Sequence, residues 1–231
     1  LRCLVGSEMC IRDRLIQHLL APLAVGWKIG AVLVSSYFVG ALLNHWCAMF
    51  IHEATHNLCA KSPLANKLMA IFSNFPMVIP IAMSFRRYHL LHHAWLGIDD
   101  RDRDLPAQFE LRLIGNKPWR KFLWLLFYLL FYLGRYSVHV RPPNRWEIFN
   151  WLVQMSVNVL IVIFLGWTAF FYLFLATWFG HGLHPVAAHF IHEHYVYKGK
   201  QETYSYYGIL NKFSFNVGYH YEHHDFMNIP G

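Results

Sequence analysis

The sequence predicts an all-α polytopic membrane protein whose transmembrane helices carry a cytoplasmic, histidine-rich cap. Of its 231 residues, 56% are hydrophobic and only 14% are charged, whereas soluble domains have about a quarter charged residues. Long uncharged runs interrupt the chain, and sixteen histidines stand beside thirteen Asp plus Glu. This composition excludes a disordered chain and argues against a soluble domain. Because imidazole is the commonest metal ligand, the histidine excess predicts a metal site.

The first fourteen residues differ in composition from all that follows. The run at 7–14, SEMCIRDR, resembles translated sequencing-adapter read-through, so we leave 1–14 out of the fold prediction as a non-native segment. Removing three basic and two acidic residues changes the net charge from +7 to +6. The remaining cysteines, Cys47 and Cys59, form no disulfide framework. We expect one membrane domain over 15–231, truncated at both ends.

Uncharged runs set the positions of the predicted spans. The run at 15–25 is too short to cross a bilayer, whereas Ile29 to Ile51 has 23 residues without a charge, and about 20 are needed for a span. Trp146 to Val186 has 41 residues with a single charge and a break at Gly166-Trp167. We expect two spans joined by a tight turn there.

Two further apolar runs are not expected to cross. Leu68 to Phe85 contains Asn74, Pro76 and Pro80, which favours a broken, re-entrant or interfacial segment whose backbone is covered by protein. Phe122 to Leu133 has about 12 apolar residues, a length that favours an interfacial helix.

Basic residues indicate the orientation in the membrane. They cluster between the predicted spans, at Arg86, Arg87, Arg101, Arg103, Arg112, Lys117, Arg120 and Lys121. The positive-inside rule places this stretch, and with it the cap, in the cytoplasm. No basic patch is interleaved with aromatic residues on a polar surface, so nucleic-acid binding is excluded.

Three histidine boxes predict the site. They are His52-Glu53-Ala54-Thr55-His56, His89-Leu90-Leu91-His92-His93 and His220-Tyr221-Glu222-His223-His224. Since positions i, i+3 and i+4 share one helix face, each box directs its imidazoles to one side. Eight ligands exceed what one six-coordinate ion can use, so we expect two ions with about four imidazoles each. Zn, Cu, Fe and Ni all suit imidazole, and the residues do not name the metal.

Two alternatives compete with a two-metal enzyme. The first box is also an H-E-x-x-H motif, in which two histidines bind zinc and Glu53 is the base of a protease. That interpretation leaves six box histidines without a role. A non-catalytic metal transporter needs ligands buried within several spans, whereas these boxes lie at helix ends and in loops.

Isolated histidines are interpreted differently from the boxes. Single imidazoles are readily satisfied by backbone groups. We therefore interpret four of them as hydrogen-bonded structural residues, namely His18, His45, His139 and His181.

Beyond the boxes, several motifs carry a family resemblance. They are Ser84-Phe85-Arg86-Arg87-Tyr88-His89, His184-Pro185, His189-Phe190, Glu193-His194-Tyr195, Glu202-Thr203-Tyr204-Ser205-Tyr206-Tyr207-Gly208, Phe215-Asn216-Val217-Gly218-Tyr219-His220 and His223-His224-Asp225-Phe226. From about Leu15 to Gly231 the chain resembles the membrane fatty-acid desaturases with three histidine boxes, and among them the sphingolipid Δ4-desaturases. It departs from their pattern at Tyr221, Met227 and His192, none of which is a box ligand.

The resemblance implies an endoplasmic reticulum enzyme with a non-haem di-iron centre. Such an enzyme uses O₂ and electrons from cytochrome b5 to introduce a double bond into the sphingoid base of dihydroceramide, a membrane lipid. Hydroxylation at the neighbouring carbon by the same scaffold is the near alternative. Breaking an unactivated C–H bond is beyond side-chain acid–base chemistry and requires a redox cofactor.

The resemblance also implies further residues around the metals. A ninth ligand is expected before the third box, and we favour His189 over His184, His192 and His194. Carboxylates near the boxes are candidates to orient the imidazoles, namely Asp99, Asp102, Asp104 and Asp225. For Asp100 and Asp102 a solvated run of charges is the favoured interpretation.

Overall fold

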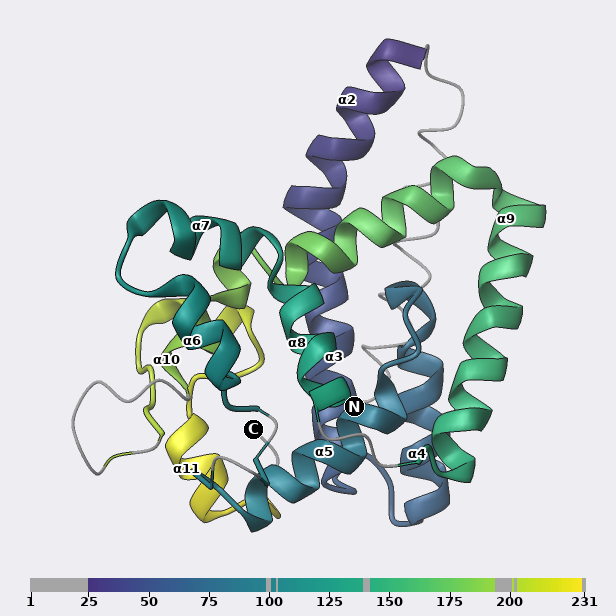
Figure 1. Cartoon of the computed structure of the whole chain (residues 1–231). Helices are drawn as coiled ribbons and strands as arrows, with labels where there is room; N and C mark the ends of the chain where they lie inside the picture. The colour runs from purple at the N-terminus through teal and green to yellow at the C-terminus, as the bar shows by residue number, and fades with distance from the viewer. Residues whose placement is uncertain are drawn as a thin grey trace.

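Two long apolar helices dominate the computed structural model (Figure 1). It describes residues 25–98, 101–102, 104–138, 142–193, 201 and 203–229, so the segment 1–14 and most of the run at 15–25 lie outside the description. Every regular element in these ranges is helical, as the sequence predicts. The α-helices are α2 (Val25–Ser35), α3 (Ala41–Thr55), α4 (Pro63–Ser73), α5 (Ala82–Ala94), α6 (Gln108–Ile114), α7 (Pro118–Leu126), α8 (Tyr128–Val138), α9 (Arg145–Gly180), α10 (His189–His192) and α11 (His220–Asp225). Shorter π or 3₁₀ turns are η1 (Ser36–Gly40), η2 (Phe75–Met77), η3 (Pro185–Ala188) and η4 (Ile209–Phe213).

The first apolar column is built from α2, η1 and α3. It runs from Ile29 to Thr55, 27 residues that are long and apolar enough to cross a membrane. The predicted apolar helix is confirmed, and its crossing stays a prediction. Its backbone lies close to α9 at two glycines. A Cβ on Gly40 would lie 2.8 Å from Ala176 Cβ, and one on Gly180 would lie 2.8 Å from Ala41 O. Only glycine allows this approach.

The second apolar column is α9, which bends sharply at the predicted break. Asn144 caps it by accepting hydrogen bonds from the backbone N–H groups of Trp146 and Glu147. Gly166 has φ +81° and ψ 171°, a conformation that favours glycine. Figure 1 shows the two arms of α9 diverging from this point. The break is confirmed, and the two crossings stay a prediction.

The run at 68–85 is interrupted as expected. Helix pair Pro63–Met77 and Ala82–Ala94 bends by 118°. Amide and hydroxyl side chains donate to five successive carbonyls of the break: Gln154 to Phe75 O, Asn44 to Pro76 O, Thr177 to Met77 O, Asn158 to Val78 O and Asn74 to Ile79 O. Because a non-helical backbone at membrane depth needs such partners, protein covers this segment as predicted.

The predicted interfacial helix over 122–133 is wrong as a single element. The chain forms α7 and α8 with a break at Phe127. A continuous helix would separate Trp124 from Arg135 by about 16 Å along its axis. In the structure both side chains donate to the carboxylate of Glu110. The turn at Phe127 makes this shared contact possible.

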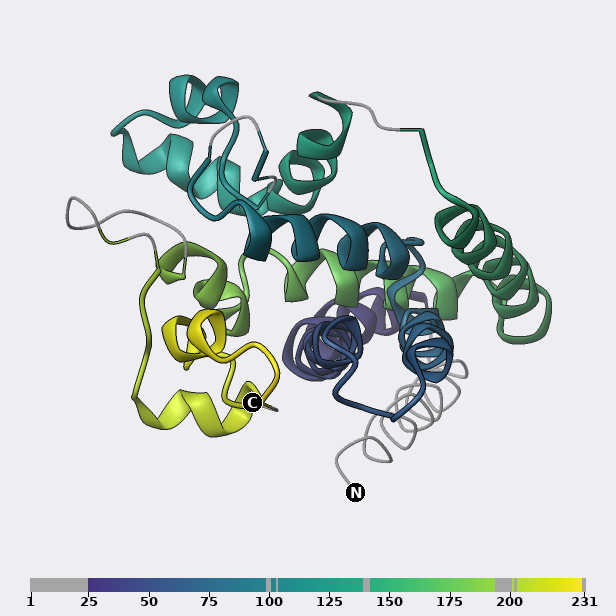
Figure 2. The same ribbon diagram turned by 90° about the horizontal axis from the view of Figure 1, so that it is seen from below.

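The helices around the break bring the boxes to one region. Helix α3 contacts α4, α5 and α9. Seen from below, α5 crosses the molecule between α3 and the group α6 to α8 (Figure 2). The ends of α3 and α5 carry the first two boxes, and α11 carries the third.

Candidate metal centre

Each box occupies a helix end or a short helix. His56 is the C-cap of α3, His92 and His93 lie in the last turn of α5, and α11 begins at His220. Helix geometry therefore directs the imidazoles, as the spacing predicts.

The eight box histidines converge into two neighbouring groups. Group one contains His52, His56, His89, His93 and His223, and group two contains His92, His220 and His224. Within each group the ligand atoms all lie within 4.8 Å of one another. The rings of His93 and His224 stack across the groups with centroids 4.3 Å apart.

The expected four-plus-four division is corrected to five plus three. Each i, i+4 pair (52/56, 89/93 and 220/224) stays within one group. His92 and His223 are offset by about 100° around their helices from the adjacent His93 and His224, and His92 groups with box three while His223 groups with boxes one and two. Both groups consequently combine residues from different boxes.

The nitrogen spacing fits metal coordination. His93 Nε2 lies 3.1 Å from the Nε2 atoms of His89 and His223. In group two, His224 Nε2 lies 3.2 Å from His92 Nε2 and 3.0 Å from His220 Nε2. Two nitrogens bound at about 2.1 Å to one ion at a right angle are about 3.0 Å apart.

Buried nitrogens in group one support the same interpretation. The Nε2 atoms of His52 and His56 are buried and have no hydrogen-bond partner among the described residues. A buried polar atom left in this way is costly unless an ion or water satisfies it. These residues therefore fit a bound metal ion.

Burial and neighbouring imidazoles keep two of the box histidines in their ligand form. Burial, followed by the neighbouring His52, lowers the pKa of His56 to about 2. Burial, followed by His92, lowers the pKa of His224 to about 2. Both rings are neutral at physiological pH, and each keeps a nitrogen lone pair for a metal.

Carboxylates outside the boxes orient two of the rings. Asp104 Oδ2 lies 3.2 Å from His89 Nδ1, and Asp102 Oδ1 lies 2.7 Å from His92 Nδ1. A carboxylate at Nδ1 places the proton there and leaves Nε2 as the ligand atom. The solvated interpretation of Asp102 is wrong: it is 2% exposed, because it binds His92 and the Gly97 N–H.

The other predicted carboxylates do not show this contact. Asp225 is exposed on α11 and makes no hydrogen bond to a box imidazole in the described part of the chain, because its side chain points to solvent. Its predicted orienting role is therefore wrong. Asp99 and Asp100 lie outside the described residues.

His189 lies beside group two. Its Nδ1 is 2.8 Å from Glu193 Oε1, and the same oxygen lies 3.8 Å from His220 Nδ1. Sequence reasoning quoted Glu193 only as part of a motif. Its i+4 spacing from His189 was the available signal, since these positions share a helix face.

The histidines outside the two metal groups include two with structural hydrogen bonds. His184 Nδ1 accepts a hydrogen bond from the Val186 N–H and caps η3, and His181 Nδ1 donates to Thr177 O, as expected of a structural residue. His18, His139, His194 and the side chain of His192 lie outside the described residues.

His45 does not follow its structural interpretation. It is 0% exposed, and both of its ring nitrogens lack a hydrogen-bond partner among the described residues. The reason is its position in α3, where helical bonds use the nearby carbonyls, and its ring packs 4.8 Å from that of His189. The predicted hydrogen-bonded role is wrong.

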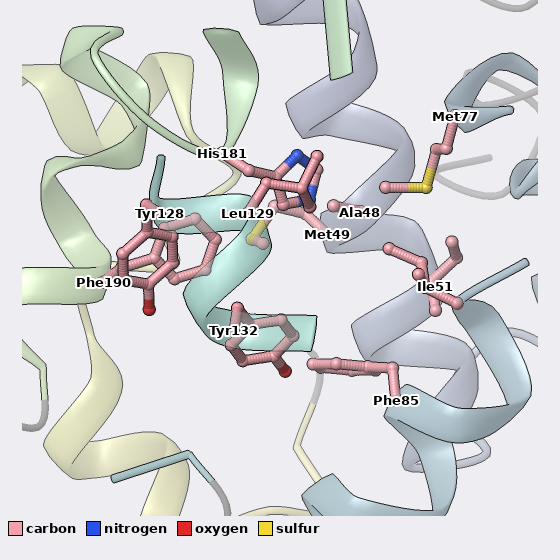
Figure 3. Close-up of a pocket in the computed structure, with 11 residues that line it drawn as sticks. Ala48, Met49, Ile51, Met77, Phe85, Tyr128, Leu129, Tyr132, His181 and Phe190 are labelled. Atoms are coloured by element: carbon pink, nitrogen blue, oxygen red, sulfur yellow. The ribbon is translucent and has the colours of Figure 1, made fainter. Parts of the chain in front are cut away.

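An apolar pocket adjoins the metal groups (Figure 3). Its lining includes Met49, Ile51, Phe85, Tyr132 and Phe190. The Phe85 ring also stacks on His89, with centroids 4.8 Å apart and 13° between planes. The wall of an apolar cavity is therefore in direct contact with group one, so the arrangement can hold two metal ions beside an apolar molecule.

Comparisons with known proteins agree with this geometry. The fatty acid desaturase family model matches residues 27–230. An Arabidopsis thaliana protein named sphingolipid delta(4)-desaturase is 45% identical over 207 residues, 89% of this chain and 61% of the relative. A Drosophila melanogaster protein of the same name is 41% identical, over 98% of this chain and 70% of the relative.

A third relative has a broader name. A Caenorhabditis elegans protein, named as both a sphingolipid delta(4)-desaturase and a C4-monooxygenase, is 43% identical over 87% of this chain and 56% of the relative. The chain thus spans about three-fifths of the length of several relatives. No solved structure matches it. With a family match over most of its length and histidine groups suited to a metal cofactor, the chain belongs to the fatty acid desaturase family.

Proposed function

We propose that this protein is a sphingolipid Δ4-desaturase, which introduces a double bond into the sphingoid base of dihydroceramide. The observation that carries the proposal is the juxtaposition of two histidine groups with an apolar pocket. The names of the relatives specify the lipid class. O₂ is the oxidant, and cytochrome b5 is the proposed electron donor.

The proposed cofactor is a pair of iron ions. His52, His56, His89, His93 and His223 would hold one ion, and His92, His220 and His224, with His189, would hold the other. When bound, the irons supply the oxidising power that breaks unactivated C–H bonds. The zinc-protease interpretation accounts for two of these ligands only.

The protein's own residues orient the ligands and shield the reaction. Asp104, Asp102 and Glu193 accept from the Nδ1 atoms of His89, His92 and His189 and direct each Nε2 inward. Phe85 covers one face of His89 and separates it from water, and the apolar pocket accepts an alkyl chain.

We propose an endoplasmic reticulum location with the boxes facing the cytosol. The apolar columns Ile29–Thr55 and Arg145–Ala188 support a multi-pass membrane protein. The basic residues of the segment that follows the second box support the orientation. A cytosolic face would give cytochrome b5 access to the metals. Nothing in the charge pattern supports nucleic-acid binding.

Lipid analysis tests the activity. The complete reading frame that encodes this chain is expressed in cells without endogenous dihydroceramide desaturase, and sphingolipids are measured by mass spectrometry. We expect Δ4-ceramide with the wild-type protein and none with His93→Ala. Absence of the product from cells that contain folded, metal-loaded wild-type protein would reject the proposal.

C4-hydroxylation is the second candidate because a relative's name includes C4-monooxygenase. Both reactions begin by removing a hydrogen from the same region of the sphingoid base, and they differ in the second step. The same measurement separates them, since hydroxylation gives phytoceramide.

A variant of Glu53 tests the protease alternative. Glu53 Oε1 lies 3.5 Å from His52 Nδ1, and its side chain is 26% exposed. We expect Glu53→Gln to keep its bound metal ions, because the imidazole ligands remain. A zinc protease would instead lose its general base and its peptidase activity while a single zinc ion stayed bound. Metal analysis and a peptidase assay on the same preparation distinguish the two.

A further inference from the structure

Tyr132 of α8 borders both the apolar pocket and the metal centre. Its ring lines the pocket, where Figure 3 shows it facing Phe85. Its hydroxyl donates to Asp104 Oδ1 at 3.1 Å, and Asp104 Oδ2 lies 3.2 Å from His89 Nδ1. One carboxylate therefore joins a tyrosine of the pocket wall to a histidine of the second box.

Phe85 provides a second connection from the same pocket to the same histidine. Its ring lines the pocket and stacks on the imidazole of His89. His89 is thus connected to the pocket directly through Phe85 and indirectly through Tyr132 and Asp104.

A buried ion pair fixes the backbone at Asp104. Arg135 donates to Asp104 O at 2.8 Å and, through Nε and Nη2, to the two carboxylate oxygens of Glu110 at 2.7 and 3.0 Å. Arg135 is 2% exposed and Glu110 is fully buried. Because a bidentate pair has one well-defined geometry, it holds the backbone here. The direction of the Asp104 carboxylate then depends on Tyr132 and His89.

We propose that Tyr132 is a positioning residue that couples the occupant of the pocket to His89 through Asp104. Its hydroxyl holds the carboxylate that fixes the tautomer and ring direction of His89. An alkyl chain in the pocket packs against Tyr132 and Phe85 and restricts the motion of both side chains. Filling the pocket therefore orders the metal ligand His89. The identity of the chain rests on the proposed function, whereas the link from Tyr132 to His89 does not.

The test uses variants of the full-length, metal-loaded protein. Tyr132→Phe keeps the ring and removes the hydroxyl that donates to Asp104, and Asp104→Asn weakens the next contact. Tyr37→Phe is the matched control: it removes a phenol hydroxyl that donates to Leu183 O at 3.3 Å, away from the residues that line the pocket. Circular dichroism checks that each variant is folded. Metal retention is measured as the rate of Fe²⁺ release to a chelator and by titration with Co²⁺.

We expect Tyr132→Phe to weaken metal retention about 10-fold, at the low end of the effect of losing a residue that orients a ligand histidine. Asp104→Asn should have at least this effect, and the double variant should be no weaker than Asp104→Asn alone, because the residues act in series. Tyr37→Phe should retain metal like the wild type. Wild-type retention in Tyr132→Phe, or effects that multiply in the double variant, would overturn the proposal.

Kinetics give an independent measurement. Tyr132→Phe should lower kcat for dihydroceramide while KM stays within about twofold, because the ring still lines the pocket. A raised KM with unchanged metal retention would make Tyr132 a simple pocket contact and refute the coupling. If the wild type forms no ceramide but the metal measurements behave as expected, the proposed function fails and the coupling stands.

Discussion

Imidazoles of the metal groups receive their direction from residues outside the three boxes. Asp104 and Asp102 accept from the Nδ1 atoms of His89 and His92, and Glu193 does the same for His189. The Nε2 atoms of His52 and His56 are buried without a protein partner among the described residues. Buried polar atoms are rarely left in this state without an ion or water nearby. At the scale of single residues, the histidine groups therefore fit bound metal ions.

Substitution of single ligands tests the grouping. His93→Ala and His223→Ala each remove one nitrogen from the five-histidine group, so we expect both to lose iron from that position and to lose activity. His184→Asn is the control, because Asn can still cap η3 by accepting from the Val186 N–H. Metal content by mass spectrometry and lipid analysis are the measurements. Full activity in either alanine variant would contradict the ligand assignment.

At the scale of elements, the interrupted segment between α4 and α5 brings the first two boxes together. A straight span there would carry α5 away from the end of α3, whereas the 118° bend returns it. Side chains of α3, α9 and Asn74 satisfy the carbonyls of the bend. The polar residues of these apolar helices therefore stabilise a turn that the site requires.

Thr177→Val tests the stability of this bend. Thr177 is fully buried, donates to Met77 O and accepts from Asn44 Nδ2, so the variant leaves two buried polar groups unpaired. We expect a loss of about 1–3 kcal/mol in the free energy of unfolding. Thr168→Val, at an exposed position of the same helix, should have little effect. Thermal unfolding in detergent compares the two variants, and equal melting temperatures would refute the role of Thr177 in stabilising the bend.

Cysteine labelling tests whether the bent segment crosses the membrane. In a background with every cysteine of the sequence replaced by serine, single cysteines are placed at Lys61 and Ile98, which lie on either side of the bend and are exposed. We expect an impermeant reagent to label both from the same face. Trp27→Cys, at the other end of the first column, should be labelled from the opposite face. Labelling of positions 61 and 98 from opposite faces would refute the shared site.

The sequence predicts local features of this fold better than long-range ones. The length of the uncharged run predicted the helical column over 29–51, and Gly166 and the prolines predicted the two breaks, because these signals are local. The division of α7 from α8 was missed because it depends on Glu110, a residue distant in sequence from Arg135. Helical spacing predicted the eight box histidines, but the five-plus-three grouping requires the relative placement of α3, α5 and α11.

At the scale of the whole molecule, the chain joins a membrane scaffold to a metal-binding face. Glycines 40 and 180 bring the two apolar columns into close contact at the start of α3, and the other end of α3, with α5 and α11, carries the box histidines. The apolar pocket lies between this scaffold and the metal groups, so a lipid chain could reach the metals without leaving an apolar environment. This architecture is what a lipid-modifying oxidoreductase requires.

Iron stoichiometry tests the central claim most directly. The protein from the complete reading frame is purified, reconstituted anaerobically with Fe²⁺, desalted, and analysed for metal per chain by inductively coupled plasma mass spectrometry. The two histidine groups predict two iron ions per chain in the wild type and fewer in His93→Ala. One ion per chain, or retention of zinc in preference to iron, would contradict the account.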